Sequence, residues 1–113
     1  MVYTPDVWVI LEIKTPERIV YKVLAGWYGG YTQGDSWQAN SGIVRVTRSK
    51  YRYLFEGYSG SIYSCSIGTE AFSGLTQQVY ERFKKDVENL DDGSSVKRIS
   101  MKTYLKRMKN AQS

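Results

Sequence analysis

Residues 7–13 (VWVILEI) constrain the fold of this 113-residue chain more than any other segment. They are β-branched, aromatic and almost wholly apolar, a pattern typical of a strand that is covered on both faces or lies in the middle of a sheet. Residues 14–17 follow with Pro16, which favours a turn. Residues 18–27 then alternate as a second strand, so this part of the chain predicts a β-hairpin.

Three further segments with strand patterns are residues 43–48, 51–58 and 61–67. Connections of about two residues join them, which is the spacing of antiparallel hairpins. The three segments therefore predict an antiparallel meander. Together with the first hairpin, they predict an antiparallel sheet of about five strands.

The spacing of apolar residues changes from two to three or four in the last third of the chain. From Phe72 to Leu90 this spacing predicts a long amphipathic helix, with Ser73 or Thr69 as its N-cap. A shorter helix is expected after Ser100, which would be its N-cap.

The fold class predicted from these elements is α+β, with one face of the sheet covered by the long helix. The length suits a single domain. Within it, residues 1–92 form the α+β body, and residues 93–113 form a basic C-terminal helix and tail of the same domain.

The composition indicates a soluble protein of the cytoplasm. Cys65 is the single cysteine and cannot form an internal disulfide, which fits a reducing compartment. Residues 1–13 lack the basic start and apolar run of a signal peptide. No apolar run approaches the roughly 20 residues that a membrane span needs. We therefore expect no membrane contact.

The residue types favour a binding protein over an enzyme. Histidine, the commonest general base and transition-metal ligand, is absent from the sequence. The glycine spacings of the phosphate-binding loops are also absent. We predict no catalytic residue, no cofactor and no metal site. A carboxylate-dependent enzyme that uses Asp35 or Glu56 is the less favoured alternative.

A glycine-rich segment crowded with aromatic rings, residues 27–42, separates the hairpin from the meander. Tyrosine and tryptophan on such a loop are typical of protein-binding hot spots, and the same rings can stack on unpaired bases. The alternative is structural: the two tryptophans cap the end of the sheet, and Asp35 bonds its own turn. The candidate partner-binding residues are Trp27, Tyr28, Tyr31, Asp35 and Trp37.

The net charge of +5 comes entirely from the C-terminal segment, because no acidic residue follows Asp92. A helix there would carry a cationic stripe, which suits phosphate contacts, a calmodulin-like partner or a membrane surface. The alternative is a solvated helix face that keeps the domain soluble. The candidate nucleic-acid-binding residues are Arg45, Arg48, Lys50, Arg52, Lys97, Arg98, Lys102, Lys106, Arg107 and Lys109.

The run Gly26-Trp27-Tyr28-Gly29-Gly30-Tyr31, with Asp35-Ser36-Trp37 and Asn40-Ser41-Gly42-Ile43 after it, resembles a segment of small uncharacterised proteins of tailed, particularly marine, bacteriophages. The resemblance covers about residues 21–46. It implies an accessory protein made in an infected bacterium, which acts by binding a host or viral macromolecule. It implies no defined activity and no site residues.

We therefore expect a small, non-enzymatic binding protein of the host cytoplasm that engages a host or viral protein through the aromatic segment. Nucleic-acid binding through the basic residues is the alternative. An open sheet also leaves edges through which the protein could form a homo-oligomer.

Overall fold

The apolar segment at residues 7–13 forms most of β2 (Val7–Lys14) in the computed structural model, which describes residues 1–30 and 34–111. β2 lies between β3 (Ile19–Trp27) and β8 (Ser95–Ile99), and β4 (Ser36–Ala39) pairs with the other side of β3. All pairings in this sheet, which we call the central sheet, are antiparallel. Residues 7–13 are all buried, which confirms the prediction of a strand covered on both faces.

A second four-stranded sheet, the outer sheet, contains the predicted meander. Its order is β1 (Val2–Tyr3), β7 (Ile62–Ser66), β6 (Arg52–Gly57) and β5 (Ile43–Arg48). The meander is antiparallel, whereas β1 joins β7 in parallel, so the sheet is mixed.

The α+β class is confirmed, but the prediction of one five-stranded antiparallel sheet is wrong. The hairpin and the meander belong to different sheets, because the chain crosses between them after β4 at residues 40–42. Two short strands, β4 and β8, extend the central sheet. β4 lies inside the segment expected to be a loop, and β8 lies in the segment assigned to the basic helix and tail.

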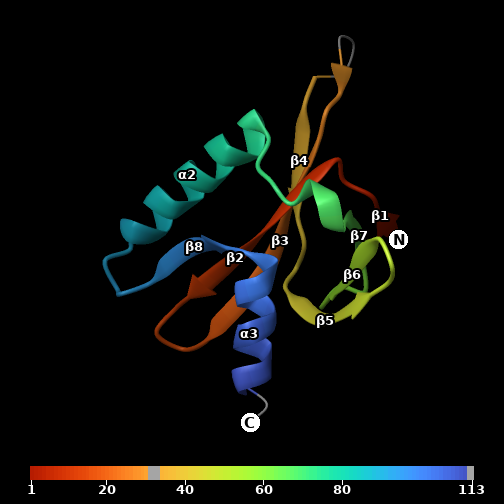
Figure 1. Cartoon of the computed structure of the whole chain (residues 1–113). Helices are drawn as coiled ribbons and strands as arrows, with labels where there is room; N and C mark the ends of the chain where they lie inside the picture. The colour runs from red at the N-terminus through yellow and green to blue at the C-terminus, as the bar shows by residue number, and fades with distance from the viewer. Residues whose placement is uncertain (31–33, 112–113) are drawn as a thin grey trace.

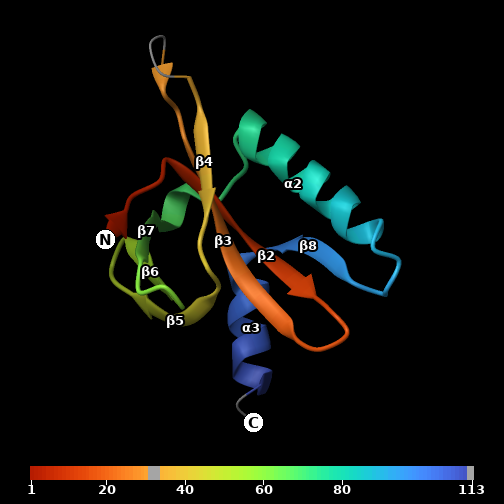
Figure 2. The same cartoon turned by 180° about the vertical axis from the view of Figure 1, so that it is seen from behind.

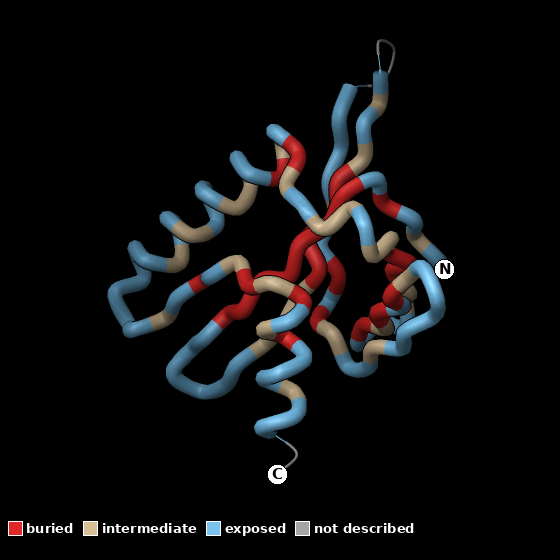
Figure 3. The backbone as a smooth tube through the Cα atoms, in the orientation of Figure 1, coloured by how far each residue is buried: buried red, intermediate tan, exposed pale blue. Residues whose placement is uncertain are grey.

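The central sheet is the middle of three layers (Figure 1). Its first face packs against the outer sheet, and the buried chain segments gather where β2 and β3 run through the molecule (Figure 3). Its second face packs against α2 (Gly74–Glu88). Residues from the central sheet in the first core are Trp8, Ile10, Val23, Ala25 and Ile99, and those in the second are Val9, Leu11, Ile13, Leu24 and Val96.

The N-cap of α2 is Ser73, one of the two residues predicted for it, and α3 is capped by the predicted Ser100. Ser73 forms a capping box with Thr76: the Thr76 backbone N–H donates to Ser73 Oγ at 3.0 Å, and the Ser73 N–H donates to Thr76 Oγ1 at 2.8 Å. Ser100 Oγ accepts from the Thr103 N–H at the start of α3 (Met101–Ala111). α3 covers the end of the first core, where Tyr104 packs against Tyr21. In the described part of the chain, neither helix is long and apolar enough to cross a membrane.

Gly26 lets the start of α2 approach β3 closely. A Cβ at this position would lie 2.8 Å from Thr76 Cγ2 and 3.1 Å from Ser73 Oγ, both buried. We expect Gly26→Ala to lower the free energy of unfolding by about 1–3 kcal/mol, because the buried cap must shift. Gly74→Ala is the matched control, since nothing lies within 4 Å of its added Cβ. Urea unfolding of the two variants measures this difference, and equal stability would contradict the account.

Candidate functional site

Trp27 and Trp37 of the aromatic segment lie on a long β3–β4 hairpin that projects from the body of the protein (Figures 1 and 2). Gly26 pairs with Trp37 and Trp27 pairs with Ser36. Since successive side chains of a strand point to opposite faces, Trp27 lies on the face of the outer sheet and Trp37 on the face of α2. The two tryptophans therefore have different surroundings.

Trp27 is held against the N-terminal segment. Its indole Nε1–H donates to the backbone oxygen of Thr4 at 3.0 Å, and its ring contacts the edge of Tyr3 at a centroid distance of 6.4 Å. The ring is half-buried and its only polar atom is paired. These contacts correspond to the structural alternative for Trp27.

Tyr28 and Asp35 lie near the exposed end of the hairpin. The Tyr28 side chain is 56% exposed, while its backbone N–H donates to Asp6 Oδ2 at 2.8 Å. Asp35 is exposed, and its Oδ1 accepts from the Gly29 N–H at 3.4 Å across the hairpin. Tyr31 falls outside the described residues. Tyr28 is thus a ring presented to solvent on an anchored backbone.

Trp37 borders an apolar groove between the central sheet and α2. The groove has a volume of about 150 Å³, and its polar atoms are few. Trp37 and Phe83, from opposite sides, remain 48% and 38% exposed. We call this feature the α2 groove; it is lined by Leu11, Ile13, Lys22, Leu24, Trp37, Ala39, Val79, Tyr80 and Phe83.

The groove is open at both ends. Beside Trp37 it widens into a hollow of about 470 Å³ that also contacts Leu75, Gln78 and Arg82. Past Phe83 a second hollow of about 470 Å³ continues toward Arg18 and Tyr58. The apolar surface is therefore accessible along the helix.

The groove is open because α2 covers the sheet incompletely. The helix and the β3–β4 hairpin diverge from the point where α2 begins (Figure 2). Thr76, in the first turn, is the only residue of α2 that is buried, although the helix is amphipathic. Of the central sheet's strands, the helix contacts β8 most, and β3 and β4 less, which leaves its Leu75–Val79–Phe83 side next to Trp37 without a full cover.

The groove residues of α2 were not among the sequence candidates. The helical spacing of Val79 and Phe83 predicts a packed face, and nothing in that spacing tells how much of the face the sheet will reach. A signal for the opposite wall was present, since Ser36-Trp37-Gln38-Ala39 alternates polar and apolar residues as a strand does.

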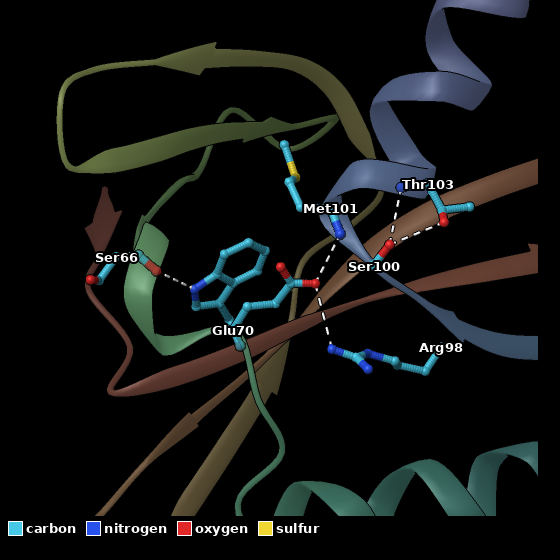
Figure 4. A network of polar contacts seen from close by, with 7 residues as sticks. Ser66, Glu70, Arg98, Ser100, Met101 and Thr103 are labelled. Atoms are coloured by element: carbon cyan, nitrogen blue, oxygen red, sulfur yellow. Dashed lines mark hydrogen bonds and ion pairs between the residues drawn. The ribbon is translucent and has the colours of Figure 1, made fainter.

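The basic residues of the outer sheet contact neighbouring side chains. Arg45 pairs with Glu56 at 3.3 Å, and Arg52 Nη1 donates to the backbone oxygen of Ser64 at 3.0 Å. Arg48 and Lys50 lie over tyrosine rings, Tyr53 and Tyr51 respectively. The turn between β5 and β6 points away from α3 (Figures 1 and 4), so this cluster does not merge with the C-terminal one.

Arg98 belongs to a network that fixes the start of α3 (Figure 4). Glu70 Oε2 accepts from the Met101 backbone N–H at 2.9 Å and from Arg98 Nη2 at 3.5 Å. The Arg98 guanidinium also lies over the Phe72 ring. A carboxylate at a helix N-terminus is favoured by the helix dipole, so Glu70 stabilises α3 through the Met101 contact and links the helix to β8 through Arg98.

Arg107 holds the other end of α3 against the central sheet. Its Nε donates to Glu12 Oε2 at 2.8 Å, and the Tyr21 hydroxyl donates to the same oxygen at 3.0 Å. Burial raises the pKa of the Glu12 carboxyl, but the hydrogen bonds from Arg107 and Tyr21 and the charges of Arg107 and Lys14 outweigh it and lower the pKa. Glu12 is therefore a buried, ionised anchor.

The remaining C-terminal cations are exposed. Among the described residues, no ion pair joins a carboxylate to Lys97, Lys102, Lys106 or Lys109. Three of them follow one another along α3 at a spacing of four and three. The free positive charge of this region thus lies on lysines, not on the two arginines.

Groups with reactive chemistry are few in the described part of the chain. Burial raises the pKa of the Cys65 thiol to about 12, against a small opposing effect of Arg52. No set of three histidine, cysteine, aspartate or glutamate side chains in residues 1–30 and 34–111 is placed to hold a metal ion. The arrangement offers contact surface: an apolar groove and a cationic helix face.

Comparison of the chain with known protein families, curated proteins and solved structures finds no match.

The Glu12 anchor generates a pH-dependent prediction. Because its folded pKa is lowered, its stabilisation is present above its ordinary pKa of about 4.5 and is lost as the pH falls through the folded value. We expect Glu12→Gln to reduce the free energy of unfolding at pH 7 by about 1–3 kcal/mol and to flatten its decline in acid. The exposed Glu17→Gln is the control. Equal denaturation curves for the two variants at pH 7 would refute the anchor.

Proposed function

We propose that this protein is a small, non-enzymatic binding module that holds an apolar segment of a partner protein in the α2 groove. The observation that carries the proposal is the pair of large rings, Trp37 and Phe83, that face the groove while partly exposed. Leaving apolar area in water costs about 25 cal/mol per Å², so a partner that covers these rings gains affinity.

The surroundings of Trp37 suit a binding hot spot. It is an aromatic side chain on a paired strand, so little backbone order is lost when it is covered. It stands beside an apolar hollow into which a partner side chain can enter. Interfaces commonly depend on a few such anchors, among which tryptophan is enriched. Tyr28, exposed near the same end of the hairpin, can extend the contact.

The likeness of residues 21–46 to small phage proteins supports a setting for this binding. An accessory protein made in an infected bacterium would meet its partner in the host cytoplasm. The partner in this proposal is accordingly a host or viral protein.

The proposal predicts that peptide binding depends on the two rings that line the groove. We expect a random 12-residue peptide display library to yield peptides whose affinity falls at least tenfold for Trp37→Ala and for Phe83→Ala, since each removes one wall. Both variants should keep a free energy of unfolding within about 1 kcal/mol of the original, because the rings are partly exposed.

Tyr51→Ala is the matched control for these variants. Tyr51 is 70% exposed and lies at the β5–β6 turn, outside the groove. It should leave peptide affinity unchanged in fluorescence polarisation. Failure of the library to yield any peptide that distinguishes Trp37→Ala from Tyr51→Ala would overturn the proposed function.

A second candidate function is nucleic-acid binding, supported by the lysine stripe of α3. Lys102, Lys106 and Lys109 are exposed, and no acidic residue follows Asp92. Each lysine that contacts a phosphate would release a counterion and make the affinity salt-dependent.

Charge removal tests this candidate without disturbing α3. We expect the triple variant Lys102→Gln, Lys106→Gln, Lys109→Gln to weaken binding to single-stranded DNA and to reduce the slope of log affinity against log salt by roughly 2. The control removes the same charge elsewhere, by Arg18→Gln, Lys84→Gln and Lys85→Gln. Arg107 is left intact because it anchors the helix through Glu12. Equal salt slopes for the two triple variants would exclude the stripe as a phosphate-binding surface.

A further inference from the structure

The open edge of β4 presents backbone groups beside the α2 groove. At the end of β4 the Asn40 N–H donates to the Val23 oxygen at 3.1 Å, and the Val23 N–H donates to Asn40 Oδ1 at 2.9 Å. Hydrogen-bonded and non-hydrogen-bonded pairs alternate along an antiparallel ladder. Counting from Asn40, the non-hydrogen-bonded positions of β4 are Ala39 and Trp37.

The hydrogen bonding between β3 and the segment at the start of β2 supports this assignment of Trp37 and Ala39. Gly26, the partner of Trp37, turns its backbone oxygen toward β2, where it accepts from the Asp6 N–H at 3.0 Å. Trp37 and Ala39 therefore direct their N–H and C=O groups away from β3. β4 is the last strand on this side of the central sheet, so these groups point to an open edge.

We infer that the partner segment binds as an extended strand along β4, with alternate apolar side chains in the hollow beside Trp37, and that the segment also carries acidic residues between or beside them. This inference rests on the proposed function and names its partner class. A strand added to β4 continues the central sheet, so its side chains on the α2 side lie next to Trp37. The other side chains point to the opposite face.

Charge favours an acidic segment as the occupant. The groove and the hollow past Phe83 are bordered by the basic side chains Lys22 and Arg18 and, in the described part of the chain, by no acidic lining residue. The hollow beside Trp37 has one side chain of each sign, Arg82 and Asp86. Acidic residues in the bound segment would meet this positive border. A second copy of the protein would bring two borders of the same sign together, which disfavours self-pairing through β4.

The experiment uses the peptide most enriched from the random 12-residue library. We expect period-two apolar residues with aspartate or glutamate between or beside them. Two synthetic forms are N-methylated at alternate residues, in opposite phases. In one form the methyl groups replace the N–H donors that face β4, and this peptide should bind at least tenfold more weakly. The other methylates amides that face away and should change affinity less than threefold.

Amide hydrogen exchange gives a second measurement on the unmodified protein. The Trp37 and Ala39 amides should become protected when the peptide binds. Replacing the acidic residues of the peptide with lysine should weaken its binding at least tenfold. The Arg82→Glu variant of the protein should partly restore the affinity for this lysine peptide.

Distinct results would overturn the inference while leaving the proposed function intact. A peptide that depends on Trp37 but has apolar residues spaced by three or four, or that loses affinity equally in both methylation phases, would bind as a helix or loop. Equal affinity of the acidic and lysine peptides would remove the charge argument. Protection of the Trp37 and Ala39 amides in a dimer of the protein alone would identify a second copy as the occupant.

Discussion

The burial of β2 on both faces is the constraint on which the rest of the structure depends. Trp8 and Ile10 are buried on one face of β2, and Val9 and Leu11 are buried on the other. An arrangement of two layers would leave one of these apolar faces in water, so a third layer is needed. The outer sheet closes the first face with its own row of aromatic side chains. A single helix closes the second face, and one helix is narrower than a four-stranded sheet. The α2 groove is the part of that face that the helix does not reach.

Local signals in the sequence were sufficient for most of the elements. Period-two alternation located the hairpin and the meander, and Ser73 and Ser100 marked the starts of both helices. The division into two sheets was not predictable in the same way, because alternation shows that a strand has two faces but not which strand lies beside it. β8 was missed since Lys97 and Arg98 dominate a short segment whose Val96 and Ile99 are its only buried residues.

The candidate site was partly predictable for a similar reason. The composition of the glycine-rich segment selected Tyr28 and Trp37 as candidates and left open whether they pack or face solvent; both are exposed. The facing wall, Val79 and Phe83, has the spacing of an ordinary core-facing helix. Two arginines selected as nucleic-acid-binding candidates have structural contacts instead. Arg98 and Arg107 appear unpaired in the sequence, yet their carboxylate partners lie 28 and 95 residues away. The pairing of β8 with β2 places Arg98 near Glu70, and the packing of α3 places Arg107 near Glu12.

Alternate side chains of β3 contribute to two different parts of the structure. Its residues at positions 21, 23 and 25 lie on the face of the outer sheet, while those at positions 20, 22 and 24 lie on the face of α2. Of the second set, Lys22 lines the groove and belongs to neither core, so substitutions there can alter the charge of the groove without disturbing the packed cores. If the groove holds a partner as proposed, its charge preference can therefore change over evolutionary time while the scaffold stays the same.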